Sequence, residues 1–106
     1  MKLISAQALK EKLDRGDNFK LVMTMGEAAY RKAHIPHSLW STVQDVASIV
    51  NPDEEIVLYC SNVHCPASIG AYHLLAKHGY TNVSRFAGGL AEWEDNGFSL
   101  VKEEYF

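Results

Sequence analysis

The chain has 106 residues, of which 47% are hydrophobic and 22% are charged, and its formal net charge is −3 at pH 7. These values predict one compact globular domain and argue against intrinsic disorder. The small negative charge, with no cluster of Lys or Arg, argues against nucleic acid or an anionic membrane as the main partner. No apolar run approaches the roughly 18 residues that span a bilayer, so we expect a cytoplasmic protein with no membrane contact.

Strand and helix patterns alternate from the start of the chain. Leu3-Ile4 is predicted to be a short strand, and Ser5 is the expected N-cap of a helix that ends at Gly16. The mostly apolar run over residues 19–25 predicts a buried strand. Residues 27–32 are expected to form a short helix after it.

The same alternation continues to the end of the chain. The predicted elements are a helix over 42–50, an inner strand over 56–59, a helix over 68–78 that Gly79 ends, a strand over 81–86, and a short helix opened by Gly88-Gly89. Such a pattern in one small domain implies a mainly parallel sheet with helices on both faces. In that architecture the functional site lies beyond the C-terminal ends of the strands.

Cys60 occupies that position. It follows the apolar strand over 56–59, and a short loop then leads from Ser61 to Ala67 and into a helix. Backbone N–H groups of such a loop, and the positive end of the following helix, stabilise a thiolate. The sequence therefore predicts a reactive thiol at Cys60.

Cys65 is the second of only two cysteines, and both lie in this loop. That usage is unlike a secreted disulfide framework and favours a redox or nucleophilic role. The two cysteines can pair if the loop brings their Cα atoms within about 7 Å. Three interpretations of Cys65 remain open: a small buried hydrophobe, a resolving thiol that attacks a persulfide or sulfenate on Cys60, or the nucleophile itself.

Histidines raise two further possibilities near the cysteines. His64 lies between them and can lower a thiolate pKa if it is protonated, although an exposed loop histidine is the preferred interpretation. Cys60, His64, Cys65 and His73 could by residue type bind zinc, but their spacing matches no specific zinc pattern. We expect no metal and no cofactor.

Several short motifs occur in an order and spacing that resemble one family, the rhodanese-like sulfurtransferase domains. The motifs are His34-Ile35-Pro36, Tyr59-Cys60, Gly79-Tyr80 with Asn82-Val83, Gly88-Gly89-Leu90, Trp93 and Gly97-Phe98. The resemblance covers nearly the whole chain and implies a single rhodanese-like domain over residues 1–106. It also implies a three-layer α/β/α fold with a mainly parallel, five-stranded sheet.

The resemblance assigns a chemical role to Cys60 as the nucleophile. A sulfurtransferase of this kind takes sulfane sulfur from a donor such as thiosulfate or polysulfide and holds it as a cysteine persulfide. The sulfur then passes to a thiol or to cyanide. The implied partners are a small sulfur donor and a thiol acceptor, and a protein partner is left open.

The active-site loop departs from the family pattern. The residues that the resemblance places in it are Ser61, Asn62, Val63, His64, Cys65, Pro66, Ala67 and Ser68. This loop is two residues longer than is usual in the family, contains no Lys or Arg, and loses one backbone N–H at Pro66. Met23 and Met25 also replace an aspartate and an arginine of the family pattern. We therefore expect thiosulfate activity to be weak or absent.

Two other functions follow from these departures. One is a catalytically reduced rhodanese-like module that binds a partner or senses oxidants through the Cys60/Cys65 pair. The other is the oxyanion chemistry of related phosphatases and arsenate reductases, which need an arginine six residues after the cysteine. Pro66 and Ala71 stand at those positions here, so this chemistry is disfavoured.

Overall fold

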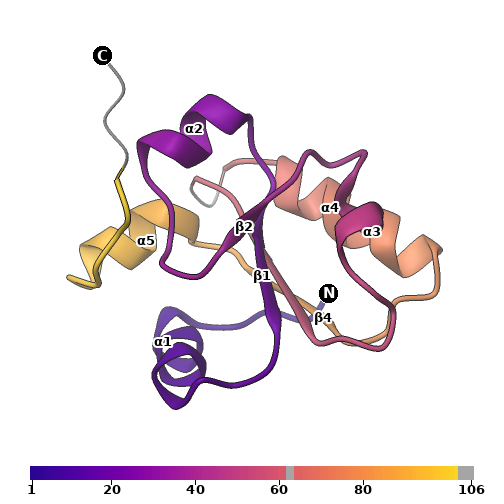
Figure 1. Cartoon of the computed structure of the whole chain (residues 1–106), viewed down its shortest axis with the longest axis horizontal. Helices are drawn as coiled ribbons and strands as arrows, with labels where there is room; N and C mark the ends of the chain where they lie inside the picture. Colours follow the sequence, from indigo (N-terminus) through magenta and orange to yellow (C-terminus); the bar gives the residue numbers. More distant parts are fainter. Residues whose placement is uncertain (62–63, 103–106) are drawn as a thin grey trace.

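One parallel sheet forms the centre of the molecule. The computed structural model describes residues 1–61 and 64–102. In that part of the chain four strands pair in the order β2-β1-β3-β4, all parallel (Figure 1). Their bounds are Lys20–Met23 for β1, Leu39–Trp40 for β2, Ile56–Tyr59 for β3 and Val83–Phe86 for β4. Every residue of β3 and β4 is buried, as expected for strands covered on both faces.

In the described part of the chain, five helices surround the sheet. They are α1 (Ala6–Arg15), α2 (Glu27–Lys32), α3 (Val46–Ile49), α4 (Ala67–Lys77) and α5 (Gly89–Asp95). Figure 1 shows α1 and α5 on one side of the sheet and α3 and α4 on the other, which makes three layers. The expected α/β fold with a mainly parallel sheet and helices on both faces is confirmed.

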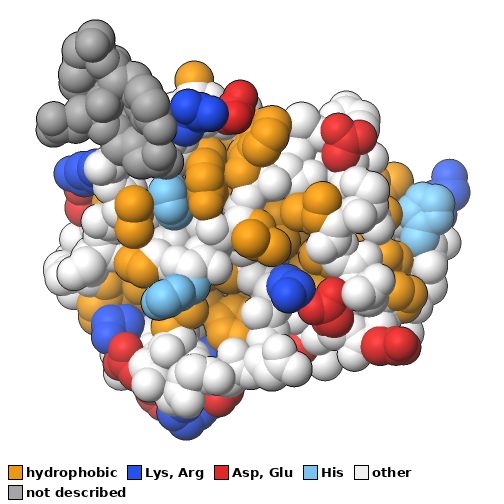
Figure 2. All heavy atoms as spheres, viewed as in Figure 1, with side chains coloured by type: hydrophobic (Ala, Val, Ile, Leu, Met, Phe, Trp, Pro, Cys, Tyr) orange, Lys and Arg blue, Asp and Glu red, His pale blue; other side chains and the backbone are white. Residues whose placement is uncertain are grey.

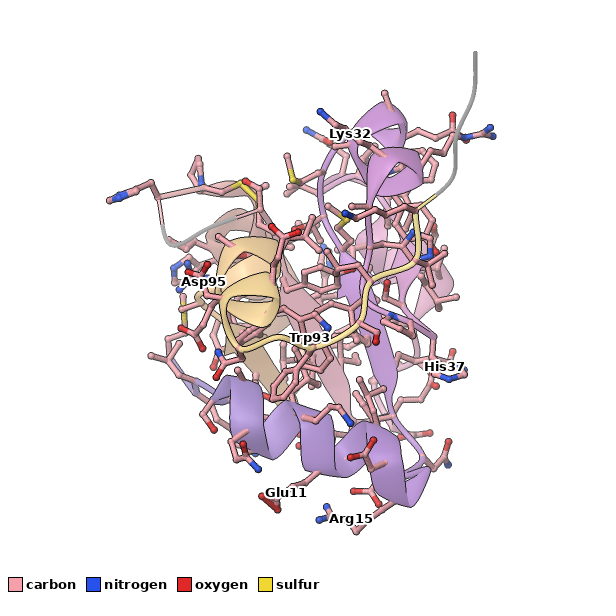
Figure 3. The ribbon with its side chains drawn as sticks, turned by 90° about the vertical axis from the view of Figure 1, so that its left-hand side faces the viewer. Glu11, Arg15, Lys32, His37, Trp93 and Asp95 are labelled. Atoms are coloured by element: carbon pink, nitrogen blue, oxygen red, sulfur yellow. A yellow bond between two sulfur atoms is a disulfide. The ribbon has the colours of Figure 1, made fainter. Side chains whose placement is uncertain are left out.

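Two apolar clusters hold the layers together. The cluster on the side of α1 and α5 contains Leu9 and Trp93, and the one on the side of α3 and α4 contains Leu58 and Leu75. Trp93 is 2% exposed and meets the rings of neighbouring aromatic side chains edge to face. Figure 3 shows it between α5 and α1.

The residues predicted to begin and end two of the helices are found at those helix ends. The Ser5 hydroxyl accepts a hydrogen bond from the N–H of Ala8 at 3.1 Å, as an N-cap does. Gly16 ends α1 with a φ of 71°, and Gly79 follows α4 with a φ of 86°. A residue without Cβ adopts this left-handed conformation at little cost.

Two sequence predictions are wrong in extent. Among the described residues the sheet has four strands and not five. Leu3 forms only an isolated bridge to Arg85, and β2, which is two residues long, was not predicted from the sequence. The helix expected over 42–50 is reduced to α3. In its place, the Thr42 hydroxyl accepts a hydrogen bond from the N–H of Asp45, and this local bond competes with a helical turn.

Other bounds agree more closely. The helix over 27–32 and the strand over 56–59 are confirmed to the residue. The strands expected over 19–25 and 81–86 are shorter at their ends than predicted. These differences leave the C-terminal edge of the sheet, where Cys60 lies, as the sequence predicts.

The surface carries charges of both signs. On the face shown in Figure 2, side chains of Lys and Arg alternate with Asp, Glu and hydrophobic side chains. Within the described ranges, no helix combines the length and the apolar character needed to cross a membrane.

Candidate active site

Cys60 lies at the C-terminal end of β3 and is 1% exposed. Its carbonyl oxygen accepts a hydrogen bond from the N–H of Leu90 at 3.0 Å, and the next carbonyl, of Ser61, accepts one from Ala91 at 2.9 Å. Gly89 makes this approach possible, because a Cβ there would overlap the Cys60 carbonyl oxygen. Gly89 therefore lets the start of α5 approach the backbone at the end of β3 closely.

Cys60 and Cys65 form a disulfide, and their Cα atoms are 6.2 Å apart. This Cα distance is shorter than the limit of about 7 Å within which two cysteines can pair. Cys65 is half-buried and is not a free thiol packed as a small hydrophobe. The structure thus describes the oxidised form of a dithiol whose two sulfur atoms lie next to each other.

The loop leads directly into the N-terminus of α4. That helix begins at Ala67, one residue earlier than predicted, with Pro66 at its N-cap position. Cys65 therefore lies two residues before a helix end whose first N–H groups have no partner within the helix. His64 is exposed, as the preferred interpretation has it. The predicted loop residues Asn62 and Val63 lie outside the described residues.

Arg85 is a buried cation beside the start of α4. Arg85 is only 6% exposed to solvent. Its Nε donates a hydrogen bond to the Ser68 hydroxyl at 2.8 Å. Ser68 is the second residue of α4 and is itself 1% exposed. Across the described residues, Arg85 has no ion pair and no further side-chain hydrogen bond.

The sequence analysis did not single out Arg85. A usable signal was present, because side chains alternate between faces along a strand and Arg85 stands two residues after the apolar Val83. A basic residue at the inward position of a buried strand is rare unless it is paired. The cation beside the start of α4 comes from the neighbouring strand β4 and not from the loop, which contains no Lys or Arg.

Tyr59 precedes Cys60 and belongs to a different buried polar group. Its hydroxyl oxygen accepts a hydrogen bond from the N–H of Ile35 at 3.0 Å and shares another with the Ser38 hydroxyl at 2.8 Å. Burial raises the pKa of Tyr59 well above its ordinary value, and these two hydrogen bonds oppose that rise only in part. Tyr59 therefore stays neutral at neutral pH and fixes the turn that contains Ile35.

The two histidines of the His34-Ile35-Pro36-His37 turn differ in setting. The His34 ring stacks on Tyr30 with centroids 3.9 Å apart, and its Nδ1 lies 2.9 Å from the Tyr30 carbonyl oxygen. His34 is buried, whereas His37 is exposed and has a φ of 70°. Neither histidine reaches the Cys60 loop through a described contact, consistent with structural roles.

A cavity of about 370 Å³ opens between α2 and α5. Its wall is mainly apolar and includes Met23 and Met25, and Ser61 reaches it from the Cys60 end. Met23 is fully buried, while Met25 is half-buried. Figure 3 shows Lys32, which also lines the cavity, projecting from α2 opposite α5. The remaining charged lining residues are Glu94 and Lys102.

Metal binding by the cysteines and histidines has no geometric support. Within residues 1–61 and 64–102, no group of three or more His, Cys, Asp or Glu side chains gathers closely enough to hold an ion. His73 is exposed on α4, and both cysteine sulfur atoms are committed to the disulfide.

Comparison with known proteins places this geometry in a family. The family described as rhodanese-like domain matches residues 5–96. A search of curated protein sequences gives no match. Among solved structures, a Bacillus halodurans protein is 19% identical with a TM-score of 0.86, over 95% of this chain and 77% of that chain.

Two other structures carry informative names. A rhodanese-like domain from Anabaena is 23% identical with a TM-score of 0.82, covering 96% of this chain and 80% of that chain. A thiosulfate sulfurtransferase from Pseudomonas aeruginosa is 18% identical with a TM-score of 0.83, covering 98% of this chain but 21% of that chain. At these identities the structural likeness establishes the fold.

Proposed function

The chain belongs to the rhodanese-like domain family, and from this premise we propose that it carries sulfane sulfur as a persulfide on Cys60. The observation that carries the proposal is the position of Cys60: it is buried at the end of β3 and bonded to a residue just before the N-terminus of α4. An anionic sulfur there faces the positive end of a helix. The domain over residues 1–106 is proposed to act as a single carrier unit.

Loading of sulfur begins with reduction of the disulfide by two equivalents of a thiol. The Cys60 thiolate then attacks the outer sulfur of the donor. With thiosulfate, the S–S bond of the donor breaks, sulfite leaves with the electron pair, and Cys60 becomes a persulfide anion. With a polysulfide, the leaving group is the shortened polysulfide.

Delivery of sulfur returns Cys60 to its starting state. An acceptor thiolate attacks the outer sulfur of the persulfide, a new S–S bond forms on the acceptor, and the Cys60 thiolate leaves. The cavity between α2 and α5 is the proposed site for the body of the acceptor, because it opens at the C-terminal edge of the sheet and Ser61, next to Cys60, lines it. The Cys60 side chain belongs to the other face of the sheet, so the thiol of the acceptor would have to reach Cys60 around this edge. Its apolar wall favours a thiol with an aliphatic body over cyanide.

Lys32 adds charge selectivity to that cavity. Its ammonium group favours an acceptor that carries a carboxylate at the end remote from its thiol. We expect mercaptohexanoate to show a lower KM than mercaptohexanol, which has the same chain length and no charge, because Lys32 attracts the carboxylate. Equal KM values would contradict this assignment of the acceptor site.

Cys65 is proposed as a resolving thiol. Its thiolate attacks the inner sulfur of the Cys60 persulfide, hydrosulfide leaves, and the Cys60–Cys65 disulfide forms. Atoms and charge balance without an added oxidant. The Cα separation of 6.2 Å supports this step, because the backbone already holds Cys60 and Cys65 within the distance that a disulfide spans.

Donor preference follows from the loop. Without Lys or Arg among residues 61–68, a dianionic thiosulfate gains fewer charge-assisted hydrogen bonds than the family usually provides. Polysulfide, whose two negative charges lie at opposite ends of a longer chain, is the proposed better donor.

Intact mass spectrometry tests the carrier function. Reduced Cys65→Ser protein treated with polysulfide is expected to gain about 32 Da, the mass of one sulfur atom, because its persulfide cannot resolve, and Cys60→Ser is the matched variant that is expected to gain none. In the wild-type protein the same adduct is expected to be lost as the Cys60–Cys65 disulfide forms and hydrosulfide is released. A Cys65→Ser protein that never acquires the adduct contradicts the proposal.

A second candidate function is supported by the disulfide itself. In a redox-sensing module, oxidation of Cys60 by peroxide gives a sulfenate, and Cys65 displaces water to form the disulfide. Fast formation of the disulfide at low peroxide, with no sulfur adduct from any donor, would favour sensing. Steady sulfur transfer to thiols would favour the carrier.

A further inference from the structure

The structure points to Arg85 as the cation of the Cys60 site, an inference that rests on the proposed role of Cys60. We infer that the Arg85 guanidinium stabilises the anionic sulfur of Cys60, as thiolate and as persulfide, once the disulfide is reduced. It takes the place of the cation that the loop lacks, and it acts from β4 instead of from the loop.

The first argument is the side on which Arg85 lies. Val83, two residues earlier, packs in the apolar cluster on the side of α3 and α4, together with Leu58 of β3. Arg85 pairs with Leu58 in the parallel register. Alternation therefore places Arg85 on this same face, and it places Cys60, two residues after Leu58, on the same face at the sheet edge.

The second argument is that two independent bonds converge on one end of α4. Cys60 is bonded to Cys65, two residues before Ala67, the first residue of the helix. The Nε of Arg85 is bonded to the hydroxyl of Ser68, the second residue of the helix. The two side chains come from adjacent strands and are both directed to the N-terminus of α4.

The third argument is the incomplete pairing of the guanidinium. An arginine has five N–H donors, and within the described part of the chain only Nε has a side-chain acceptor, although the residue is 6% exposed. Among the described residues no fully buried side-chain nitrogen lacks a hydrogen-bond partner, so the other nitrogens of Arg85 keep some contact with solvent and can still meet an anion. The reduced pair supplies that anion, since a thiolate is formed at the same helix end.

The thiol also lies near other ionisable groups, which must be held constant in any test. His64 is in the loop and His73 is on α4, both exposed, and Glu92 and Glu94 are exposed on α5. Cys65 is the other thiol of the pair. None of these groups is a buried cation, so the effect of Arg85 is separable from theirs by substitution at Arg85 alone.

Alkylation of reduced protein in a Cys65→Ser background tests the inference, since it reports Cys60 alone. Arg85→Met is expected to slow reaction with iodoacetamide about tenfold at pH 7 and to move the pH profile of the rate to higher pH. Arg85→Lys, which keeps the charge, should stay within about threefold of the parent rate. Arg31→Met, which removes an exposed arginine, is the matched control and should leave the profile unchanged.

Identical alkylation profiles for Arg85 and Arg85→Met would overturn the inference. If Arg85→Met does not fold, NMR of the parent protein decides: the Arg85 Nε–H signal should shift with the same midpoint as Cys60 ionisation, and it should not shift in Cys60→Ser. An Arg85 signal that is insensitive to Cys60 ionisation would overturn the inference as well.

The two proposals fail in different ways. Alkylation requires no sulfur donor, so a confirmed Arg85 effect without any sulfur adduct would contradict the carrier function and leave the charge pairing standing. A normal sulfur adduct with no Arg85 effect would contradict the charge pairing alone.

Discussion

Tyr59 and Arg85 are buried polar side chains on neighbouring strands, and they face opposite sides of the sheet. Tyr59 lies with the apolar cluster on the side of α1 and α5, and its hydroxyl bonds to both Ile35 and Ser38. Arg85 lies on the side of α4 and has one side-chain hydrogen bond, to Ser68. Both are buried to a similar degree, at 0% and 6% exposure.

The difference separates a polar group that stabilises the fold from one kept for chemistry. Tyr59 has a partner for its hydroxyl as donor and as acceptor, so its burial is compensated. Arg85 is a largely buried charge with no ion pair among the described residues, and its terminal nitrogens depend on residual contact with solvent, so its burial is less well compensated. The side with α1 and α5 is therefore expected to contribute stability, and the end of α4 to contribute reactivity.

Truncation on the side of α1 and α5 should have the largest effect on stability. Trp93→Ala is expected to lower the free energy of unfolding by about 3–5 kcal/mol, because a buried ring and its hydrogen bond to the Ser99 carbonyl are lost. Chemical denaturation measures the change. Trp40→Ala is the control, with a smaller expected loss because Trp40 is only half-buried. Equal losses of unfolding free energy in the two variants would show that the apolar cluster around Trp93 does not contribute more to stability than the half-buried Trp40.

Removing the Tyr59 hydroxyl should have an intermediate effect. Tyr59→Phe leaves the Ile35 N–H and the Ser38 hydroxyl without this partner, and we expect a loss of about 1–3 kcal/mol in the free energy of unfolding. The alkylation rate of Cys60 should not change. A variant as stable as the parent protein would show that this hydroxyl is not a stabilising group.

Replacing Arg85 should have a small effect on stability despite its burial. Arg85→Met exchanges an incompletely paired charge for an apolar chain of similar length, so we expect the free energy of unfolding to change by less than about 1 kcal/mol, or to rise. Urea denaturation of the two proteins measures it. If Arg85→Met loses more unfolding free energy than Tyr59→Phe, Arg85 is a stabilising group, and the proposed difference between Arg85 and Tyr59 is wrong.

The smallest expected effect is a change with pH in the stability that the Tyr59 hydroxyl contributes. Because burial raises the folded-state pKa of Tyr59, the native protein keeps its proton at a pH where the unfolded chain releases it. Stability from this group is complete below about pH 10, the unfolded pKa, and falls as pH rises above it. The difference in stability between parent and Tyr59→Phe should therefore shrink above pH 10, and a constant difference would contradict this.

Much of the fold could be predicted from the sequence because its signals are local. Ser5 and Gly16 bound α1, and the run over residues 56–59 has no alternative to a buried strand. The helix expected over 42–50 is shorter because the hydrogen bond from the Asp45 N–H to the Thr42 hydroxyl competes with the first helical turn that the valine spacing favours. The fifth strand failed because Leu3 pairs at a single bridge.

Only the part of the site formed by residues that are close in sequence could be predicted. The position of Cys60 and the possibility of its pairing with Cys65 follow from the strand and the loop. Arg85 is 25 residues beyond Cys60, and the pairing of β3 with β4 brings it near. Its approach to Ser68 depends on how α4 packs on that sheet, which no local pattern encodes.

Sulfur carriage by Cys60 is tested by the intact mass of two single variants. Reduced Cys65→Ser, in which a persulfide cannot resolve, and reduced Cys60→Ser are incubated with polysulfide, desalted and weighed. We expect Cys65→Ser to gain about 32 Da, which a thiol acceptor removes, and Cys60→Ser to gain nothing. A Cys65→Ser protein without the adduct, or a Cys60→Ser protein that acquires it equally, would contradict the proposed role of Cys60.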